Sequence, residues 1–231
     1  MKPSKSTAVA ETKRAKEGEP STEAKILDAA EQLFAELGYD ATNVRLINSL
    51  AKVNSGAIHY HFGTKEDLFR RVMLRRGTLF AEDRLARLSA CRAGAGRPPL
   101  LKQIIESYVL PYTNPALGSR EDRFRFARLR ARLMIEPRAA LDSPLGPTHE
   151  AVGRRFVKAL ADCLPHLSPD EVRFRYQIMW SSLNTLSAAL GPAALGKKAG
   201  GKPVDPMVEF EKNMPRLVES FAALFQAPST K

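Results

Sequence analysis

Apolar positions near the start of the chain recur with the spacing of an amphipathic helix. A stripe of five apolar residues follows Pro20: Ile26, Ala30, Leu33, Phe34 and Leu37. Residues spaced in this way lie on one face of an α-helix, so we expect this face to be buried. Ser21 or Thr22 is suited to cap the start of the helix, and Gly38 to end it. The pattern predicts a first helix between these caps.

Two short helical patterns joined by a tight turn occupy residues 42–65. We expect the turn at 52–54, and Asn54 or Ser55 is suited to cap the second helix over 55–62. Residues three or four apart share a helix face. The faces predicted to be buried carry Val44, Ile47 and Leu50 in the first helix and Ile58 and Phe62 in the second. Helices this short need packing partners on both sides.

A longer helix is expected over residues 64–90. Thr64 is suited to cap it, and Asp67 completes a capping box three residues later. Lys65 places a cation at the positive end of the helix dipole, which is unfavourable unless an anion is close. A DNA phosphate would be such an anion, and a solvated surface lysine is the alternative. The candidate packing residues are Leu68, Val72, Leu74, Leu79 and Leu85.

Helical patterns recur through the rest of the chain, separated by proline and glycine. They cover about 98–113, 121–136, 147–164, 168–190 and 205–226. No stretch keeps the alternation of apolar and polar residues that is typical of strands. The sequence therefore predicts an all-α protein.

Charge gives a weaker indication of the partner than its total suggests. The net charge of +11 and the isoelectric point near 9.9 favour a polyanionic partner. Residues 22–63, however, carry three Lys or Arg against five Asp or Glu, a net charge of −2. The excess of cations falls in residues 64–92 and 120–138. The two short helices are therefore not basic overall, and charge alone does not identify DNA as the partner.

The sequence lacks the signatures of catalysis and metal binding. It has no nucleophile elbow, phosphate loop or HExxH motif. His59 and His61 point apart on a helix and have no cluster of Cys or carboxylates to complete a metal site. Cys91 and Cys163 have no ligand spacing and are expected to be reduced cytosolic thiols. We expect no enzyme activity, cofactor or metal, and no apolar run is long enough to span a membrane.

Taken together, the N-terminal motifs resemble the tetracycline-repressor (TetR/AcrR) family of bacterial regulators. The matching segments within about residues 22–75 are ILDAAEQLFAELGYDATNVRLI, VNSGAIHYHF and GTKEDL. The resemblance implies that residues 55–62 form a recognition helix in the major groove of double-stranded DNA. By position it implies DNA contacts from Thr42, Arg45, Asn54, Ser55, Gly56, Ala57, His59, Tyr60, His61 and Lys65.

Four positions depart from the family pattern, among them Asn48 and Leu50, which replace common alanines. Lys52 stands where the turn usually has glycine, and a left-handed lysine there would cost roughly 1 kcal/mol. His59 stands where tyrosine is usual, which makes the side chain shorter and able to titrate near neutral pH. These departures affect the expected DNA contacts and leave the expected fold unchanged.

The resemblance also implies an effector-binding and dimerising C-terminal part. We expect a disordered basic tail over 1–20, a helix-turn-helix DNA-binding domain over 21–68 and a C-terminal domain over 69–227. Aromatic, polarisable or polar residues on predicted inner faces are pocket candidates, with ordinary core packing as the alternative: Tyr108, Tyr112, Phe126, Arg130, Met134, Met179 and Asn184. Within this set, an inward-facing Arg130 could meet an anionic ligand.

The last two long helices supply the dimer candidates, again with core packing as the alternative: Trp180, Leu183, Leu186, Leu217, Phe221 and Leu224.

These expectations define a function and one alternative. The function is a cytoplasmic, ligand-responsive transcriptional repressor that binds a pseudo-palindromic operator as a homodimer. The alternative is a small-molecule-binding or sequestering protein with a vestigial DNA-binding domain. The net charge of −2 over residues 22–63 keeps this alternative open.

Overall fold

The computed structural model describes residues 20–92, 100–133, 146–189 and 206–229, and every element in them is a helix. In chain order the α-helices are α2 (Thr22–Leu37), α3 (Val44–Ala51), α4 (Ala57–Phe62), α5 (Lys65–Arg92), α6 (Leu101–Val109), α7 (Arg120–Leu133), α9 (Gly146–Cys163), α10 (Pro169–Ala189) and α11 (Pro206–Gln226). Two 3₁₀ turns, η1 (Leu110–Thr113) and η2 (Pro115–Leu117), follow α6. The chain is all-α, as predicted. None of these helices combines the length and apolar character needed to cross a membrane.

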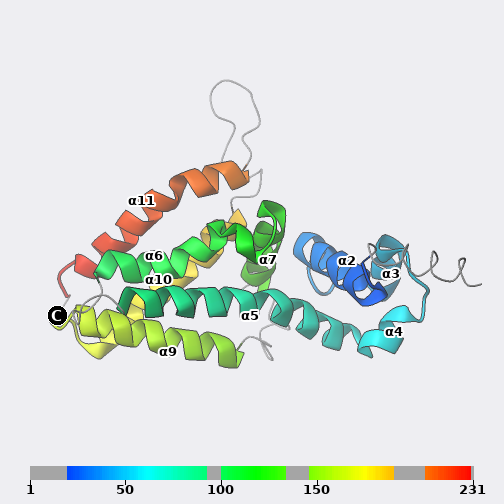
Figure 1. The fold of residues 1–231 in the computed structure, drawn as a ribbon, viewed down its shortest axis with the longest axis horizontal. Coiled ribbons are helices and arrows are strands. Elements are labelled where there is room, and N and C mark those ends of the chain that lie inside the picture. The colour runs from blue at the N-terminus through cyan, green and yellow to red at the C-terminus, as the bar shows by residue number, and fades with distance from the viewer. Residues whose placement is uncertain (1–19, 93–99, 134–145, 190–205, 230–231) are drawn as a thin grey trace, which may run out of the picture.

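Helix α5 connects the two ends of the molecule (Figure 1). Helices α2, α3 and α4 gather at one end of it, whereas α6, α9, α10 and α11 surround its other end. Its 28 residues span about 42 Å at 1.5 Å per residue. The expected domain boundary between residues 68 and 69 falls inside this continuous helix, and the expected tail over 1–20 lies outside the described residues except for Pro20.

Hydrogen bonds at the helix starts follow the predicted capping chemistry in two of three places. Ser21 Oγ accepts a hydrogen bond of 3.1 Å from the Ala24 N–H at the start of α2. Thr64 Oγ1 accepts one of 3.0 Å from the Asp67 N–H at the start of α5. Helix α4 is different, because it begins at Ala57 without a side-chain cap. The prediction of a cap at Asn54 or Ser55 is therefore wrong, and the helix starts two residues later than expected.

The predicted buried faces are correct in part. Ile47 is fully buried, but Leu50 is 44% exposed and Leu37, in the last turn of α2, is 45% exposed. Residues spaced by three drift around a helix with 3.6 residues per turn, so Leu50 points about 120° away from Val44. On α5 the same error occurs for Leu74 and Leu79, which are exposed.

Candidate DNA interface and ligand cavities

The turn between α3 and α4 is held by two residues that precede the recognition helix. Lys52 has φ 55° and ψ 47°, the left-handed conformation that glycine adopts most easily. Its N–H lies 3.2 Å from the Ser49 carbonyl oxygen, which closes the end of α3. The buried Asn48 then donates a hydrogen bond of 3.0 Å from Nδ2 to the Ser55 carbonyl oxygen. These bonds fix where α4 begins relative to α3.

Helix α4 turns a polar and aromatic face to solvent. Ile58 and Phe62 anchor its other face in the core, as predicted. Tyr60 is 85% exposed, and His59 and His61 on either side of it are exposed as well. The His59 ring is held in place because Nδ1 lies 3.0 Å from the Gly63 carbonyl oxygen, a contact that requires Nδ1 to carry the proton.

Other predicted DNA contacts lie around this face. Arg45 on α3 and the three residues before α4 are exposed: Asn54, Ser55 and Gly56. Nothing lies within 4 Å of the place where a Cβ of Gly56 would stand, so this approach is open. Ala57, the first residue of α4, is half-buried.

Thr42 does not lie on this surface. Its side chain is fully buried, and its hydroxyl lies 2.7 Å from the Gly38 carbonyl oxygen and 3.1 Å from that of Leu33. The hydroxyl therefore ties the segment after α2 back to that helix. The expectation of a DNA contact by Thr42 is not supported for its side chain.

Lys65 is half-buried in the first turn of α5. Its Nζ lies 4.2 Å from the centre of the Tyr39 ring, within the range of a cation–π interaction. Burial lowers the pKa of Lys65, and the nearby Asp40 carboxylate opposes this shift in part. The Lys65 ammonium group is therefore held in position by Tyr39 and partly desolvated without any bound anion.

Three of the four acidic side chains of α2 face α5 and are neutralised there. Glu31 is fully buried and pairs with Arg75 and with Arg76, whose Nε lies 3.4 Å from Oε1. Glu23 pairs with Arg71 and Asp28 with Arg75, both at 2.8 Å. The net charge of −2 over residues 22–63 therefore does not describe the exposed face of α3 and α4, because three of those five acids belong to the α2–α5 contact.

The pocket candidates come together in the interior of the C-terminal helices. Six of the seven are buried: Tyr108, Tyr112, Phe126, Arg130, Met179 and Asn184. The seventh, Met134, lies outside the described residues. The Tyr112 hydroxyl accepts a hydrogen bond of 3.1 Å from Arg130 Nη1 and lies 3.4 Å from Asn184 Oδ1. Burial would raise the pKa of Tyr112, but the charges of Arg130 and Arg84 outweigh it and lower this pKa.

Arg84 belongs to the same cluster and was not expected from the sequence. Its side chain is 3% exposed, Nε donates a hydrogen bond of 2.9 Å to the Tyr108 carbonyl oxygen, and the guanidinium carbon lies 4.1 Å from the centre of the Tyr108 ring. The Tyr176 hydroxyl lies 3.3 Å from that of Tyr108. Arginine on a long basic helix is typical of a solvated face, so no local pattern distinguishes Arg84 from its exposed neighbours.

Two cavities open beside these helices. A cavity of about 660 Å³ between α9 and α10, the α9–α10 cavity, is lined by His149, Glu150, Gly153, Arg154, Val157, Lys158, Ala161, Pro169, Arg173, Tyr176, Gln177 and Trp180. Burial, followed by the charges of Arg130 and Arg84, lowers the pKa of His149 to about 3, so this wall of the cavity lies within the field of both arginines. Volumes of this size are usual for small-molecule sites.

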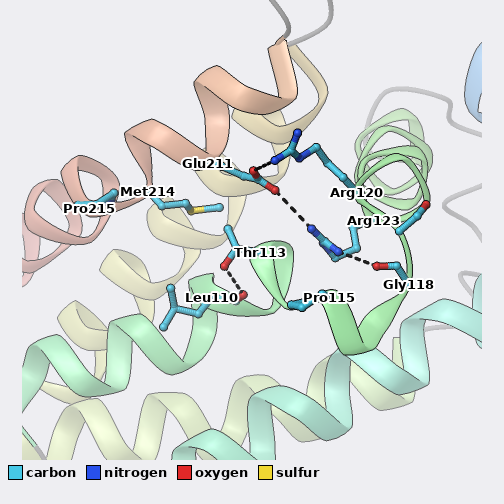
Figure 2. A pocket seen from close by; sticks show the side chains of 10 residues that line it. Leu110, Thr113, Pro115, Gly118, Arg120, Arg123, Glu211, Met214 and Pro215 are labelled. Atoms are coloured by element: carbon cyan, nitrogen blue, oxygen red, sulfur yellow. Dashed lines mark hydrogen bonds and ion pairs between the residues drawn. The ribbon is translucent and has the colours of Figure 1, made fainter.

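A second cavity, of about 770 Å³, lies between the 3₁₀ turns and α11. Figure 2 shows that Arg120 and Arg123 both reach Glu211 there, at 2.7 and 3.3 Å. Arg123 also donates to the Gly118 carbonyl oxygen at 2.6 Å. The cations of this cavity are therefore paired within the protein.

The dimer candidates separate into core and surface residues. Leu183 and Phe221 are buried within the single chain, where core packing accounts for them. Leu186 is 36% exposed. The other three, Trp180, Leu217 and Leu224, are half-buried.

Family models match both parts of the chain. Residues 26–72 match the model of bacterial regulatory proteins of the tetR family, and residues 106–223 match the tetracyclin repressor-like C-terminal domain. The second match alone covers half of the chain. Both models describe transcriptional regulators, which are not a class of enzymes. The chain belongs to the TetR family of transcriptional regulators, whose members bind DNA and usually dimerise.

Curated relatives match the N-terminal helices. The HTH-type transcriptional repressor Rv3405c of Mycobacterium tuberculosis is 46% identical over 61 residues, which are 26% of this chain and 32% of that protein. The HTH-type transcriptional regulator QacR of Staphylococcus aureus is 43% identical over 49 residues, 21% of this chain and 26% of that protein. The chain thus spans about a third or less of the length of these relatives.

Solved structures match most of the chain at low identity. The fatty acid degradation regulator FadR of Bacillus halodurans has a TM-score of 0.60 at 16% identity, over 90% of this chain and 96% of that one. AmtR of Mycobacterium smegmatis has a TM-score of 0.59 at 17% identity, over 93% and 91%. These likenesses establish the fold of the C-terminal helices as well as that of the helix-turn-helix.

Proposed function

We propose that this protein is a cytoplasmic, homodimeric repressor that binds a pseudo-palindromic operator and is released by a small-molecule ligand. The observation that carries the proposal is the exposed face of α4, with Tyr60 between two exposed histidines, anchored through Ile58 and Phe62. Two such helices in a dimer would enter successive major grooves about 34 Å apart. Arg45 beside α4 and Lys65 at the start of α5 would supply cations to the flanking backbone.

The charge distribution favours this function over a vestigial DNA-binding domain. Glu23, Asp28 and Glu31 are occupied by arginines of α5 and do not repel DNA from the α4 face. The cations Arg45 and Lys52 are exposed on the α3 side of the turn. Three of the five acids of residues 22–63 are thus paired away from this face, which supports DNA binding over a vestigial domain.

Helix α7 offers a physical connection between the interior cluster and the DNA-binding helices. Arg130 on α7 contacts the Tyr112 hydroxyl inside the C-terminal helices. Two residues later, Arg132 donates hydrogen bonds to the Ala35 and Glu36 carbonyl oxygens at the end of α2, at 3.0 and 2.7 Å. A ligand that favours one position of α7 would therefore change the position of α2 and weaken DNA binding.

Binding to the DNA upstream of the protein's own gene tests the proposal. We expect a specific, salt-sensitive complex in a fluorescence anisotropy titration, and Arg45→Ala should weaken it at least tenfold. Arg155→Ala, which removes an exposed arginine of α9, is the matched control and should leave affinity unchanged. Binding that is absent, or that does not distinguish this DNA from a scrambled duplex, would support the sequestering alternative instead.

A further inference from the structure

Arginines buried in the described part of the chain differ in whether a carboxylate neutralises them. Four are less than 6% exposed: Arg84, Arg123, Arg130 and Arg175. Arg123 lies 3.3 Å from Glu211, and Arg175 lies 2.6 Å from Glu171. Arg175 additionally donates to carbonyl oxygens at the end of α11. For these two arginines the fold itself supplies the negative charge.

Arg84 and Arg130 have no carboxylate partner among the described residues. Their contacts are with neutral groups: Arg84 with the Tyr108 carbonyl oxygen and ring, and Arg130 with the Tyr112 hydroxyl. Nη2 of Arg84 is buried without any hydrogen-bond partner. A buried guanidinium stays charged at any physiological pH, and burying such a charge without a counter-charge is costly. Both cations act on Tyr112, and none of the described residues supplies an anion to this cluster.

The α9–α10 cavity gives this anion a place for an apolar body. Val157, Ala161 and Trp180 line it. Tyr176 also lines it, and its hydroxyl lies 3.3 Å from that of Tyr108, whose ring lies beneath Arg84. The cations of the lining each have an acidic partner: Arg154 with Glu150, Lys158 with Asp162, and Arg173 with Asp170. Of the described cations near the cavity, those without a carboxylate partner therefore lie deeper, beyond Tyr176.

We infer that the ligand of this regulator is an organic acid whose apolar body occupies the α9–α10 cavity and whose anionic head is bound by Arg84 and Arg130. The inference rests on the proposed function, since it names the chemical class of the effector. Guanidinium groups bind carboxylate and phosphate by the same charge-assisted hydrogen bonds. The proposed organic acid can therefore carry a carboxylate or a phosphate head group, and the titration below distinguishes the two. The second cavity lacks this feature, because Glu211 already neutralises its arginines.

Calorimetric titration of the full chain with matched probes tests the inference. Octanoate, octyl phosphate and octanamide share the same apolar body and differ in the head group. We expect one or both acids to bind at least tenfold more tightly than the neutral amide. Tighter binding of octanoate would identify a carboxylate as the preferred head group. Tighter binding of octyl phosphate would identify a phosphate. Equal binding of acid and amide, or no binding of either acid, would overturn the inference.

Variants locate the two parts of the ligand. Arg84→Met and Arg130→Met should each remove the preference for the acid and leave octanamide binding unchanged. Gly153→Leu, which fills the cavity next to Tyr176, should weaken acid and amide alike. Arg120→Met, which changes an arginine of the second cavity, should keep the preference for the acid. Acid binding that survives in both the Arg84 and the Arg130 variants would overturn the assignment.

Thermal stability separates loss of binding from loss of folding. Arg84→Met and Arg130→Met each remove a buried charge that none of the described carboxylates neutralises, so the melting temperature of the ligand-free protein should be unchanged or higher. Arg175→Met, which leaves Glu171 without its partner, should lower it. An Arg84→Met protein that melts lower and binds the acid normally would show that this arginine is only structural.

DNA binding is measured separately, so that the two proposals can fail independently. If octanoate binds through Arg84 but leaves the operator complex intact, the anion site stands and the ligand response of the proposed function fails. If DNA binds specifically and no acid binds, the repressor function stands and the effector class is wrong.

Discussion

Lys65 combines an unfavourable position with a favourable contact. A cation in the first turn of α5 opposes the helix dipole, at a cost of a few tenths of a kcal/mol. The Tyr39 ring, 4.2 Å from Nζ, offsets this by about 0.5–1 kcal/mol. The net result is an ammonium group held in one place beside free N–H groups at a helix start. Such an arrangement suits a phosphate oxygen better than it suits water.

Replacing Lys65 should weaken DNA binding without changing sequence preference. Lys65→Ala removes one phosphate contact, so the slope of log K against log[salt] should fall by about one, and affinity should fall evenly across operator variants. Anisotropy titrations at several salt concentrations measure both quantities. Lys102→Ala, which changes an exposed lysine of α6, is the control. A changed base preference would show that Lys65 contacts bases.

His149 should make the folded state sensitive to mild acid. Its pKa of about 3 in the folded protein lies below the ordinary value of 6.5, chiefly because of burial. Between these values the unfolded chain binds a proton that the folded chain does not, so stability falls as pH drops below 6.5. From pH 7 to 5.5 this loss should be about 1 kcal/mol.

Urea denaturation at the two pH values measures this loss. His149→Gln should show less of it, whereas His166→Gln, which changes an exposed histidine, should keep it in full. An identical pH dependence in wild type and His149→Gln would contradict the prediction.

At the scale of elements, α2 is fastened to α5 and α7 by buried charges as well as by apolar packing. Glu31 lies between Arg75 and Arg76, and Arg76 continues to Asp122 on α7 at 3.3 Å. Arg132 adds its bonds to the end of α2. These ion pairs and hydrogen bonds are directional, and they hold α2 to α5 and α7. A movement of α7 would therefore shift α2 and the helices packed on it.

Neutralising Glu31 should loosen this attachment. Glu31→Gln removes the buried carboxylate shared by Arg75 and Arg76 and leaves them only their partners Asp28 and Asp122. We expect unfolding stability to fall by about 1–3 kcal/mol. Glu36→Gln on the exposed face of the same helix should change it by less than about 0.5 kcal/mol. Chemical denaturation measures both. Equal effects of the two substitutions would mean that the buried network does not hold α2.

The same helices show which features the sequence predicts and which it does not. Caps such as Ser21 and Thr64 depend on residues three positions apart, so local rules identify them correctly. The partners of Glu31 lie 44 and 45 residues away, and a charge sum along the chain therefore gave the wrong impression of the α4 face. Arg84 was missed for the same reason, because its burial is created by α6 and η1.

At the scale of the whole molecule, the proposed activity requires a second copy of the chain. Leu186 on α10 is a large apolar side chain left exposed by the single chain, in one of the two helices from which dimer contacts are expected. Leu183, one turn earlier, already belongs to the internal core. The expected interface therefore uses the outer face of α10 and α11, since their inner face is filled.

Introducing a charge at Leu186 should separate the copies. Leu186→Glu places a carboxylate in the expected apolar interface, so light scattering after size-exclusion chromatography should report a monomer, and operator affinity should fall at least a hundredfold. Leu79→Glu changes a leucine of similar exposure, 40%, on α5 and should remain dimeric. If both variants stay dimeric and bind DNA, the interface lies elsewhere.

Helix α5 carries Lys65 at one end and Arg84 about 28 Å further along its axis. If both proposed sites act through this single rod, the coupling between them must be mutual: whatever the acid does to DNA affinity, DNA does to acid affinity by the same factor. The acid concentration at which half of an operator's copies are free of repressor then depends on the protein and on the sequence of that operator. Several promoters under one such repressor would be switched on in sequence as the acid accumulates, those with the weakest operators first.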